Sequence, residues 1–145
     1  MLDLVLAILH HVFIFALFGV LIGELVLVKR GMGVVAATRM AAIDIWYGVL
    51  AGLILIVGFS RAIFAAKGWL YYEHNAFFHA KIVTFLVIAL LSVRPTVVFI
   101  RWRRAPVDPT HGQITEVRRY LWIELVLFPL LVVFAAAMAR GYGEF

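Results

Sequence analysis

Four long apolar stretches divide this sequence, and polar positions gather between them. The stretches cover residues 2–28, 41–66, 76–100 and 120–139. Each is about as long as the ~20 residues that a helix needs to cross the ~30 Å hydrocarbon core of a bilayer. Because an open backbone has no water to bind at that depth, segments of this length are predicted to be helices. The pattern predicts an all-α integral membrane four-helix bundle, formed as a single domain by residues 1–145.

Composition agrees with a membrane protein. The chain is 66% hydrophobic and 14% charged, and its mean hydropathy is +1.06, which an ordinary water-soluble domain of this length does not reach. It contains no cysteine, so a metal or cofactor would have to be held by His, carboxylate or Met. The first stretch has no basic segment before it and is too long for a signal peptide, so we expect it to stay in the mature chain.

Basic residues predict how the chain is oriented in the membrane. They concentrate around the first and third connections between stretches, at Lys29, Arg30, Arg39, Arg101, Arg103, Arg104, Arg118 and Arg119, whereas the second connection holds Lys67. The positive-inside rule then predicts two basic cytoplasmic connections, with both termini and the loop 68–75 on the outer side of the membrane. The net charge of +5 is interpreted as this topology signal. We therefore expect contact with lipid headgroups and no nucleic-acid partner.

Five basic side chains form a predicted outer layer, namely His10, His11, Arg61, His79 and Lys81. Ionisable groups at membrane depth are unfavourable and usually face the interior of a bundle. With a rise of ~1.5 Å per residue, His10 lies about 12 Å and Lys81 about 8 Å below the outer ends of their helices. His79 and Lys81 are about 200° apart around their helix, so they cannot face the same way. We expect Lys81 to face inward, with snorkelling to the interface as the alternative.

Helical phase separates the two adjacent histidines. Asp3, His10, Leu17 and Glu24 recur every seven residues and share one face of the first helix. If Glu24 faces the interior, His10 does too, and His11 points about 100° away. Adjacent residues do not converge on one zinc ion. One histidine per helix does suit an axial haem ligand, because the porphyrin supplies the other four nitrogens.

The inner half of the predicted bundle carries carboxylates. Glu24, Asp44 and Glu124 lie near the inner ends of three helices, and Arg94 is expected at a similar level as a cationic partner. The four residues predict a buried ion network. Such a network can hold helices in register, or it can relay protons, and the sequence leaves both interpretations open.

Tryptophan and tyrosine residues cluster near the predicted helix ends, where they are interpreted as interfacial anchors. This set includes Trp46, Tyr47, Trp102 and Trp122. Trp69 and Tyr72 are the two that lie beside the outer basic layer and are considered near a site.

Several stretches resemble an uncharacterised bacterial family of four-helix membrane proteins, the DUF2214 family. They are ILHHVFIF, GELVLVK, RMAAIDIWYG, AAKGWLYYEHNAFFHAK, SVRPTVVFIRW, VRRYLWIELVLF and AAAMARG. This resemblance implies a bacterial inner membrane, whose periplasmic side is then the outer side of the predicted topology. The resemblance spans essentially the whole chain, and the positions interpreted as shared are His10, His11, Glu24, Asp44, Lys81, Pro95 and Glu124. The family pattern has an aromatic residue, usually Trp, where this chain has His79.

The chain is also similar, over shorter stretches, to HemJ-type protoporphyrinogen oxidases, which are four-helix inner-membrane proteins that bind haem b. FHAKIVTFLVIAL is similar to their third helix, and both have a histidine in the first helix. Glu124 ahead of Pro129 is similar to their acidic-proline element. The resemblance implies a haem b pocket in the outer layer, with His10 or His11 as axial ligand. It further implies that Lys81 or Arg61 faces the propionates or a substrate.

Three hypotheses follow. The first is a haem b oxidoreductase or electron-transfer protein, in which His10 and His11 are candidate iron ligands, Lys81 and Arg61 candidate catalytic residues, and His79 a further cofactor-binding candidate. The second is a non-enzymatic membrane subunit or assembly factor that binds other membrane subunits or a second copy of itself. The third is a small proton or ion pathway through the inner carboxylates and the outer histidines. No nucleotide-binding loop, nucleophile–base pair or zinc spacing is present.

Overall fold

The computed structural model describes residues 1–64 and 68–145, which form helices joined by short connections. The four long helices are α1 (Leu2–Leu27), α2 (Val34–Phe64), α4 (Ala76–Arg104) and α5 (His111–Ala139), and a short helix α3 (Gly68–Glu73) precedes α4. All four long helices have the length and apolar character needed to cross a membrane. The prediction of an all-α membrane protein with four spanning helices is confirmed.

Three of the four long helices extend beyond the predicted apolar stretches, at one end each. α2 begins at residue 34 and not 41, α5 begins at 111 and not 120, and α4 continues to 104. Polar and basic residues lower the hydropathy of these segments, but they do not interrupt the helical hydrogen bonds, so the helices continue beyond the hydrocarbon core. The predicted loop 68–75 contains α3. Residues 65 and 66, at the predicted end of the second stretch, lie outside the described residues, as does Lys67.

Side-chain caps define where two of these extended helices begin. The backbone N–H of Val34 donates to Asp108 Oδ1 over 2.8 Å. This hydrogen bond links the start of α2 to the connection between α4 and α5, residues 105–110. At α5, Thr110 and Gln113 form a capping box in which each side chain accepts from the other residue's backbone N–H. These polar residues satisfy N–H groups that have no partner within a helix.

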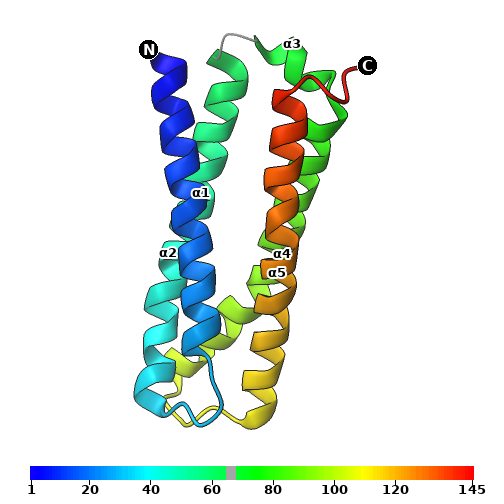
Figure 1. The fold of residues 1–145 in the computed structure, drawn as a ribbon. Helices are drawn as coiled ribbons and strands as arrows, with labels where there is room; N and C mark the ends of the chain where they lie inside the picture. The colour runs from blue at the N-terminus through cyan, green and yellow to red at the C-terminus, as the bar shows by residue number, and fades with distance from the viewer. Residues whose placement is uncertain (65–67) are drawn as a thin grey trace.

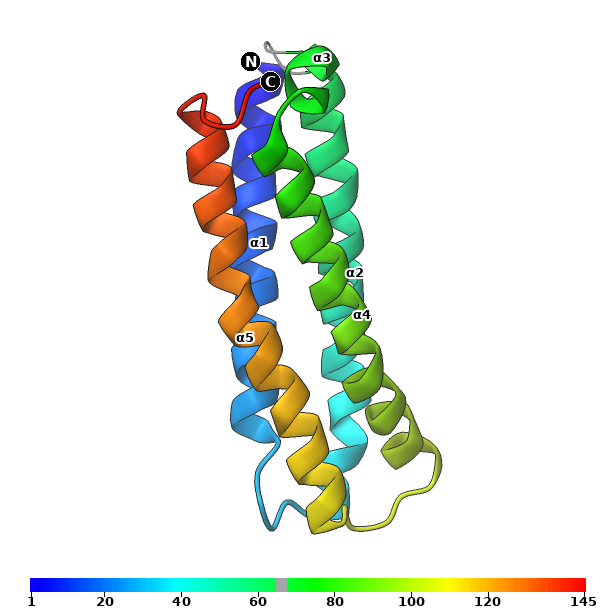
Figure 2. The same cartoon turned by 90° about the vertical axis from the view of Figure 1, so that its right-hand side faces the viewer.

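The four long helices form an antiparallel bundle in which α1 packs mainly on α2 and α4 mainly on α5 (Figures 1 and 2). The contact between α1 and α5 is the least extensive of the four neighbouring pairs. Both termini and α3 lie at one end, called here the terminal end (Figure 1). The connections 28–33 and 105–110 lie at the other, the basic end. Which side of the membrane each end faces stays a prediction.

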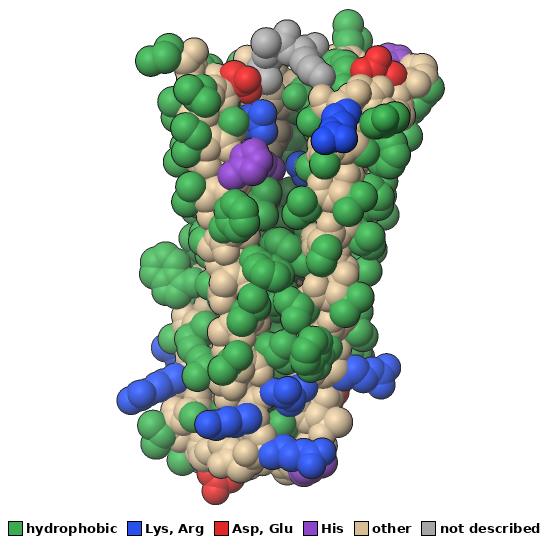
Figure 3. Space-filling view, in the orientation of Figure 1, with side chains coloured by type: hydrophobic (Ala, Val, Ile, Leu, Met, Phe, Trp, Pro, Cys, Tyr) green, Lys and Arg blue, Asp and Glu red, His purple; other side chains and the backbone are tan. Residues whose placement is uncertain are grey.

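Apolar side chains cover the middle of the bundle, and Lys and Arg side chains gather toward the basic end (Figure 3). Many large apolar residues are exposed on the outside, among them Leu90, Val126 and Phe15. In a membrane these residues contact lipid, so the bilayer is a partner of this surface. The core is also apolar, and Leu21 and Phe99 are fully buried in it.

We predict that Asn75→Ala destabilises the terminal end. The Asn75 side chain is fully buried, accepts from the backbone N–H groups of Phe77 and Phe78 at the start of α4, and donates to the Tyr142 carbonyl over 3.1 Å. Loss of such a cap lowers the free energy of unfolding by about 1 kcal/mol. Reversible unfolding in mixed micelles, followed by circular dichroism, measures it. His74→Ala, at the exposed neighbouring position, is the control, and an equal loss in both variants would contradict the role of the cap.

Candidate functional site

A cavity of about 310 Å³ lies inside the terminal half of the bundle, and all five helices contribute to its walls. We call it the His10 cavity. Its polar lining comes from His10, His11, Arg61, Tyr71, Tyr72 and Lys81. Toward the middle of the bundle it ends on apolar side chains, including Leu17, Phe85 and Phe128. None of the described residues that line it is acidic, so its charged side chains are cationic and its floor is apolar.

His10 is the most deeply placed polar residue of this cavity, with an exposed fraction of 5%. Its ring lies against α2 at Gly58, where a Cβ would stand only 3.1 Å from His10 Cε1. The absence of a side chain at Gly58 therefore lets the imidazole approach the α2 backbone. Its Nδ1 is buried without a hydrogen-bond partner of ordinary geometry, and the ring is in hydrogen-bonding contact with the Ile54 backbone of α2. Buried polar atoms are nearly always satisfied, so this nitrogen marks a position where a ligand atom could bind.

His11 occupies a different environment, as the helical phase predicted. It is exposed at the edge of the cavity, and its Nδ1 lies 2.6 Å from the Ala7 carbonyl, one turn earlier in the same helix. The His10 and His11 rings meet edge to face with centroids 6.2 Å apart. The two histidines thus line one cavity from different faces of α1.

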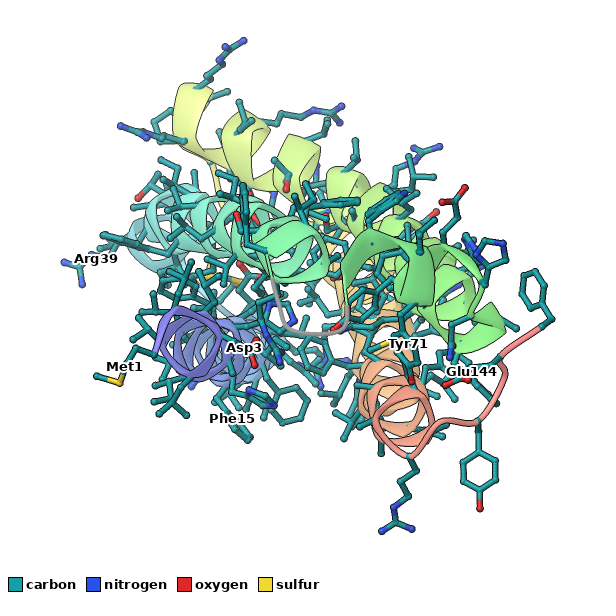
Figure 4. The ribbon with its side chains drawn as sticks, turned by 90° about the horizontal axis from the view of Figure 1, so that it is seen from above. Met1, Asp3, Phe15, Arg39, Tyr71 and Glu144 are labelled. Atoms are coloured by element: carbon teal, nitrogen blue, oxygen red, sulfur yellow. The ribbon has the colours of Figure 1, made fainter. Side chains whose placement is uncertain are left out.

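The two cations of the cavity reach it from α2 and α4. Arg61 Nε lies 3.5 Å from Asp3 Oδ1, so one of the two cations is paired with a carboxylate that is not itself among the lining residues. Figure 4 shows Asp3 directed toward the interior of the bundle, whereas Met1 and Phe15 point away. Lys81 is half-buried and lines the cavity. Its side chain therefore faces inward and does not snorkel to the interface, the other predicted orientation. In Figure 3 histidine and cationic side chains are visible in the hollow between α1 and α5.

His79 does not lie with these four residues. It is exposed, and its Nε2 lies 2.8 Å from the Glu73 carbonyl at the end of α3. The reason is the phase difference of about 200° from Lys81, which directs the two side chains to opposite faces of α4. The prediction that His79 contributes to a cofactor site is therefore not borne out by its position. Trp69 is likewise exposed, whereas both Tyr71 and Tyr72 line the cavity.

A second polar group lies in the basic half of the bundle, and we call it the carboxyl cluster. It consists of Glu24, Asp44 and Glu124, whose exposed fractions are 1%, 7% and 0%. The Tyr47 hydroxyl donates to Glu124 Oε2 over 2.8 Å. Asp44 is in hydrogen-bonding contact with Glu24. The remaining oxygens, Oε1 of Glu24 and Oε1 of Glu124, are buried without a hydrogen-bond partner.

The carboxyl cluster lacks the cation that the sequence predicted for it. Arg94 is exposed on the outside of α4, and within residues 1–64 and 68–145 the one ion pair closer than 4.0 Å joins Arg61 to Asp3. The long guanidinium side chain can reach the interface instead of entering the bundle, which is less unfavourable than burial. The prediction of an Arg94 partner is therefore wrong. Tyr47 was not predicted to belong to this cluster, although its position three residues after Asp44 places both on one face of α2.

Comparison with known proteins assigns the chain to a family. A family model described as a predicted membrane protein, DUF2214, matches residues 2–143. This match confirms the resemblance found in the sequence. No curated protein and no solved structure matches the chain.

Proposed function

We propose that this chain, which belongs to the DUF2214 family of predicted membrane proteins, holds haem b in the His10 cavity and serves as a membrane redox or electron-transfer protein. The observation that carries the proposal is the buried Nδ1 of His10, without a hydrogen-bond partner of ordinary geometry, on the wall of that cavity. A neutral imidazole nitrogen is a common axial ligand of haem iron. Bound haem would supply one-electron redox chemistry.

The cations of the cavity support an anionic cofactor. Arg61 and Lys81 line it from two helices, and the described residues that line it include no carboxylate. Haem b carries two propionates, which need cationic or hydrogen-bonding partners at membrane depth. Arg61 and Lys81 would hold these groups, or the anionic group of a substrate. The Asp3 carboxylate already shares Arg61 and would compete with a propionate there.

His10 is the better supported of the two histidine ligands. Its ring position is set by contact with Gly58, and it lies deeper than His11. The Nδ1 of His11 is already engaged by the Ala7 carbonyl, and the ring is exposed at the edge of the cavity. Apolar residues below His10 would surround part of a bound haem, and a dry shell around a haem raises the influence of each nearby charge on the reduction potential. A ligand from the bilayer would enter between α1 and α5, which make the least extensive contact of the neighbouring long helices.

An absorption spectrum of the purified protein tests the proposal. We expect a Soret band after expression with added haem precursor, its loss in His10→Ala, and its retention in the matched control His79→Ala, whose histidine lies outside the cavity. His11→Ala should keep most of the band. Absence of the band from folded wild-type protein supplied with haem, or equal bands in wild type and His10→Ala, would contradict the proposal.

A further inference from the structure

A groove of about 610 Å³ between α2 and α4 leads from the basic end to the carboxyl cluster. Its polar lining includes Asp44 and Tyr47 of α2, with Ser92, Thr96, Arg103 and Arg104 of α4. A space of this size has room for several water molecules. The groove therefore brings the surface of the basic end into contact with the Asp44 carboxyl, which itself contacts Glu24.

From this geometry we infer that the carboxyl cluster is a proton-exchange site, loaded and emptied through the groove between α2 and α4 from the basic end. The site is separate from the His10 cavity. Apolar core side chains fill the bundle between the two, among them Leu17, Leu21, Phe85 and Ile88. The inference therefore assigns one-sided proton exchange and no path across the membrane, and it does not depend on haem binding.

The balance of charges favours a bound proton. The cluster itself is formed by Glu24 from α1, Asp44 and Tyr47 from α2, and Glu124 from α5. From α4 the neutral Ser92 and Thr96 face it, and Arg103 and Arg104 lie at the groove. Arg118 is held away from it by the carbonyls of Leu25 and Val28. Carboxylates buried without a cation are highly unfavourable.

The hydrogen bonds lead to the same assignment. Asp44 contacts both Thr96 and Glu24, and because an ionised carboxylate only accepts hydrogen bonds, the contact between the two carboxyl groups favours a proton on one of them. The unpartnered Oε1 atoms of Glu24 and Glu124 are further positions for a proton. Among the described residues no group of three or more His, Cys, Asp or Glu side chains has the geometry to hold a metal ion. The proton moves between carboxyl oxygen and groove water, and no bond to carbon changes.

Infrared difference spectroscopy of the whole purified protein tests the site. We expect a carbonyl band from a protonated carboxyl at neutral pH that shifts when H2O is replaced by D2O. Glu24→Gln or Glu124→Gln should remove at least part of the band, and the control Glu116→Gln, at an exposed position of α5, should leave it unchanged. A folded wild type without such a band, or a band lost equally in Glu116→Gln, would overturn the inference.

Two glycine variants test the route. Gly48 lines the groove and Gly52 does not, and a Cβ at either position would meet no atom within 4 Å. Gly48→Leu should therefore block the groove and slow the exchange of the band into D2O several-fold, whereas Gly52→Leu should exchange at the wild-type rate. Equal rates in the two variants would overturn the groove as the route.

Two further measurements separate the inference from its nearest alternatives. Addition of NaCl at constant pH should leave the carboxyl band unchanged, and its loss would show that a metal cation and not a proton occupies the cluster. Proteoliposomes containing wild-type protein should show no proton flux above empty vesicles. A flux that Glu124→Gln abolishes would overturn one-sided exchange in favour of a path across the membrane.

Discussion

Replacing Trp102 by alanine is expected to lower the free energy of unfolding by about 3 kcal/mol or more. The side chain has an exposed fraction of 2% and packs on Phe99 with ring centroids 5.6 Å apart. Its Nε1 donates over 3.1 Å to Gln113 Oε1, the same oxygen that accepts from the Thr110 backbone in the capping box of α5. The variant would leave a cavity between α4 and α5 and remove this link. Dispersion contacts are lost whether the surroundings are water or lipid.

Trp122→Ala is the matched control for this prediction. Trp122 is 50% exposed on the outer surface of α5, so its ring exchanges protein contacts for lipid contacts at little net loss. Unfolding of both variants by a denaturing detergent in mixed micelles, followed by circular dichroism, gives the two free energies. Similar losses in the two variants would show that the packing of Trp102 between the helices is not what stabilises this end.

Replacing Arg118 by alanine is expected to lower the free energy of unfolding by about 2–3 kcal/mol. The Arg118 Nη1 donates to the carbonyl of Leu25 over 2.8 Å and also to the carbonyl of Val28. These carbonyls lie at the end of α1, where the last turn of a helix has no N–H partners of its own. The positive charge also interacts favourably with the negative end of the helix dipole. Loss of the guanidinium would free the end of α1 from α5.

The neighbouring residue supplies the control for Arg118. Arg119→Ala removes the same charge from an exposed position of the same helix, so it should change stability little. Arg118→Lys should give an intermediate loss, because an ammonium group is a point donor and lacks the planar fork of guanidinium. The same detergent titration compares the three variants. A loss for Arg119→Ala as large as that for Arg118→Ala would assign the effect to net charge and not to the two hydrogen bonds.

Helical periodicity predicted more of the candidate sites than the types of individual residues did. The seven-residue spacing from Asp3 to Glu24 placed His10 and Glu24 on the buried face of α1, and both are buried. Such a prediction works because side chains in an uninterrupted helix have fixed angular positions. The interpretation of Tyr47 and Trp102 as interfacial anchors was wrong, since both are buried. Position near a helix end did not distinguish an anchor facing lipid from a side chain packed between helices.

Arg94 and His79 show that the depth of a residue along its helix does not predict which other residues it contacts. Both were assigned to a site because their depth matched that of its other members, yet both are exposed on α4. Depth follows from counting residues along one helix, whereas a contact depends on how that helix is rotated about its axis. The rotation results from packing against three neighbours, and a single sequence carries little information about it.

Hydropathy along the chain was enough to define an all-α membrane protein of four spanning helices, because transfer into lipid depends on local composition. The distribution of basic residues predicted its orientation. The tertiary structure decided which polar residues meet. It brought His10, Arg61 and Lys81 around one cavity, and it joined Glu24, Asp44 and Glu124 with Tyr47 in a cluster without a cation. These contacts join residues of different helices, so they follow from interhelical packing, which no local pattern records.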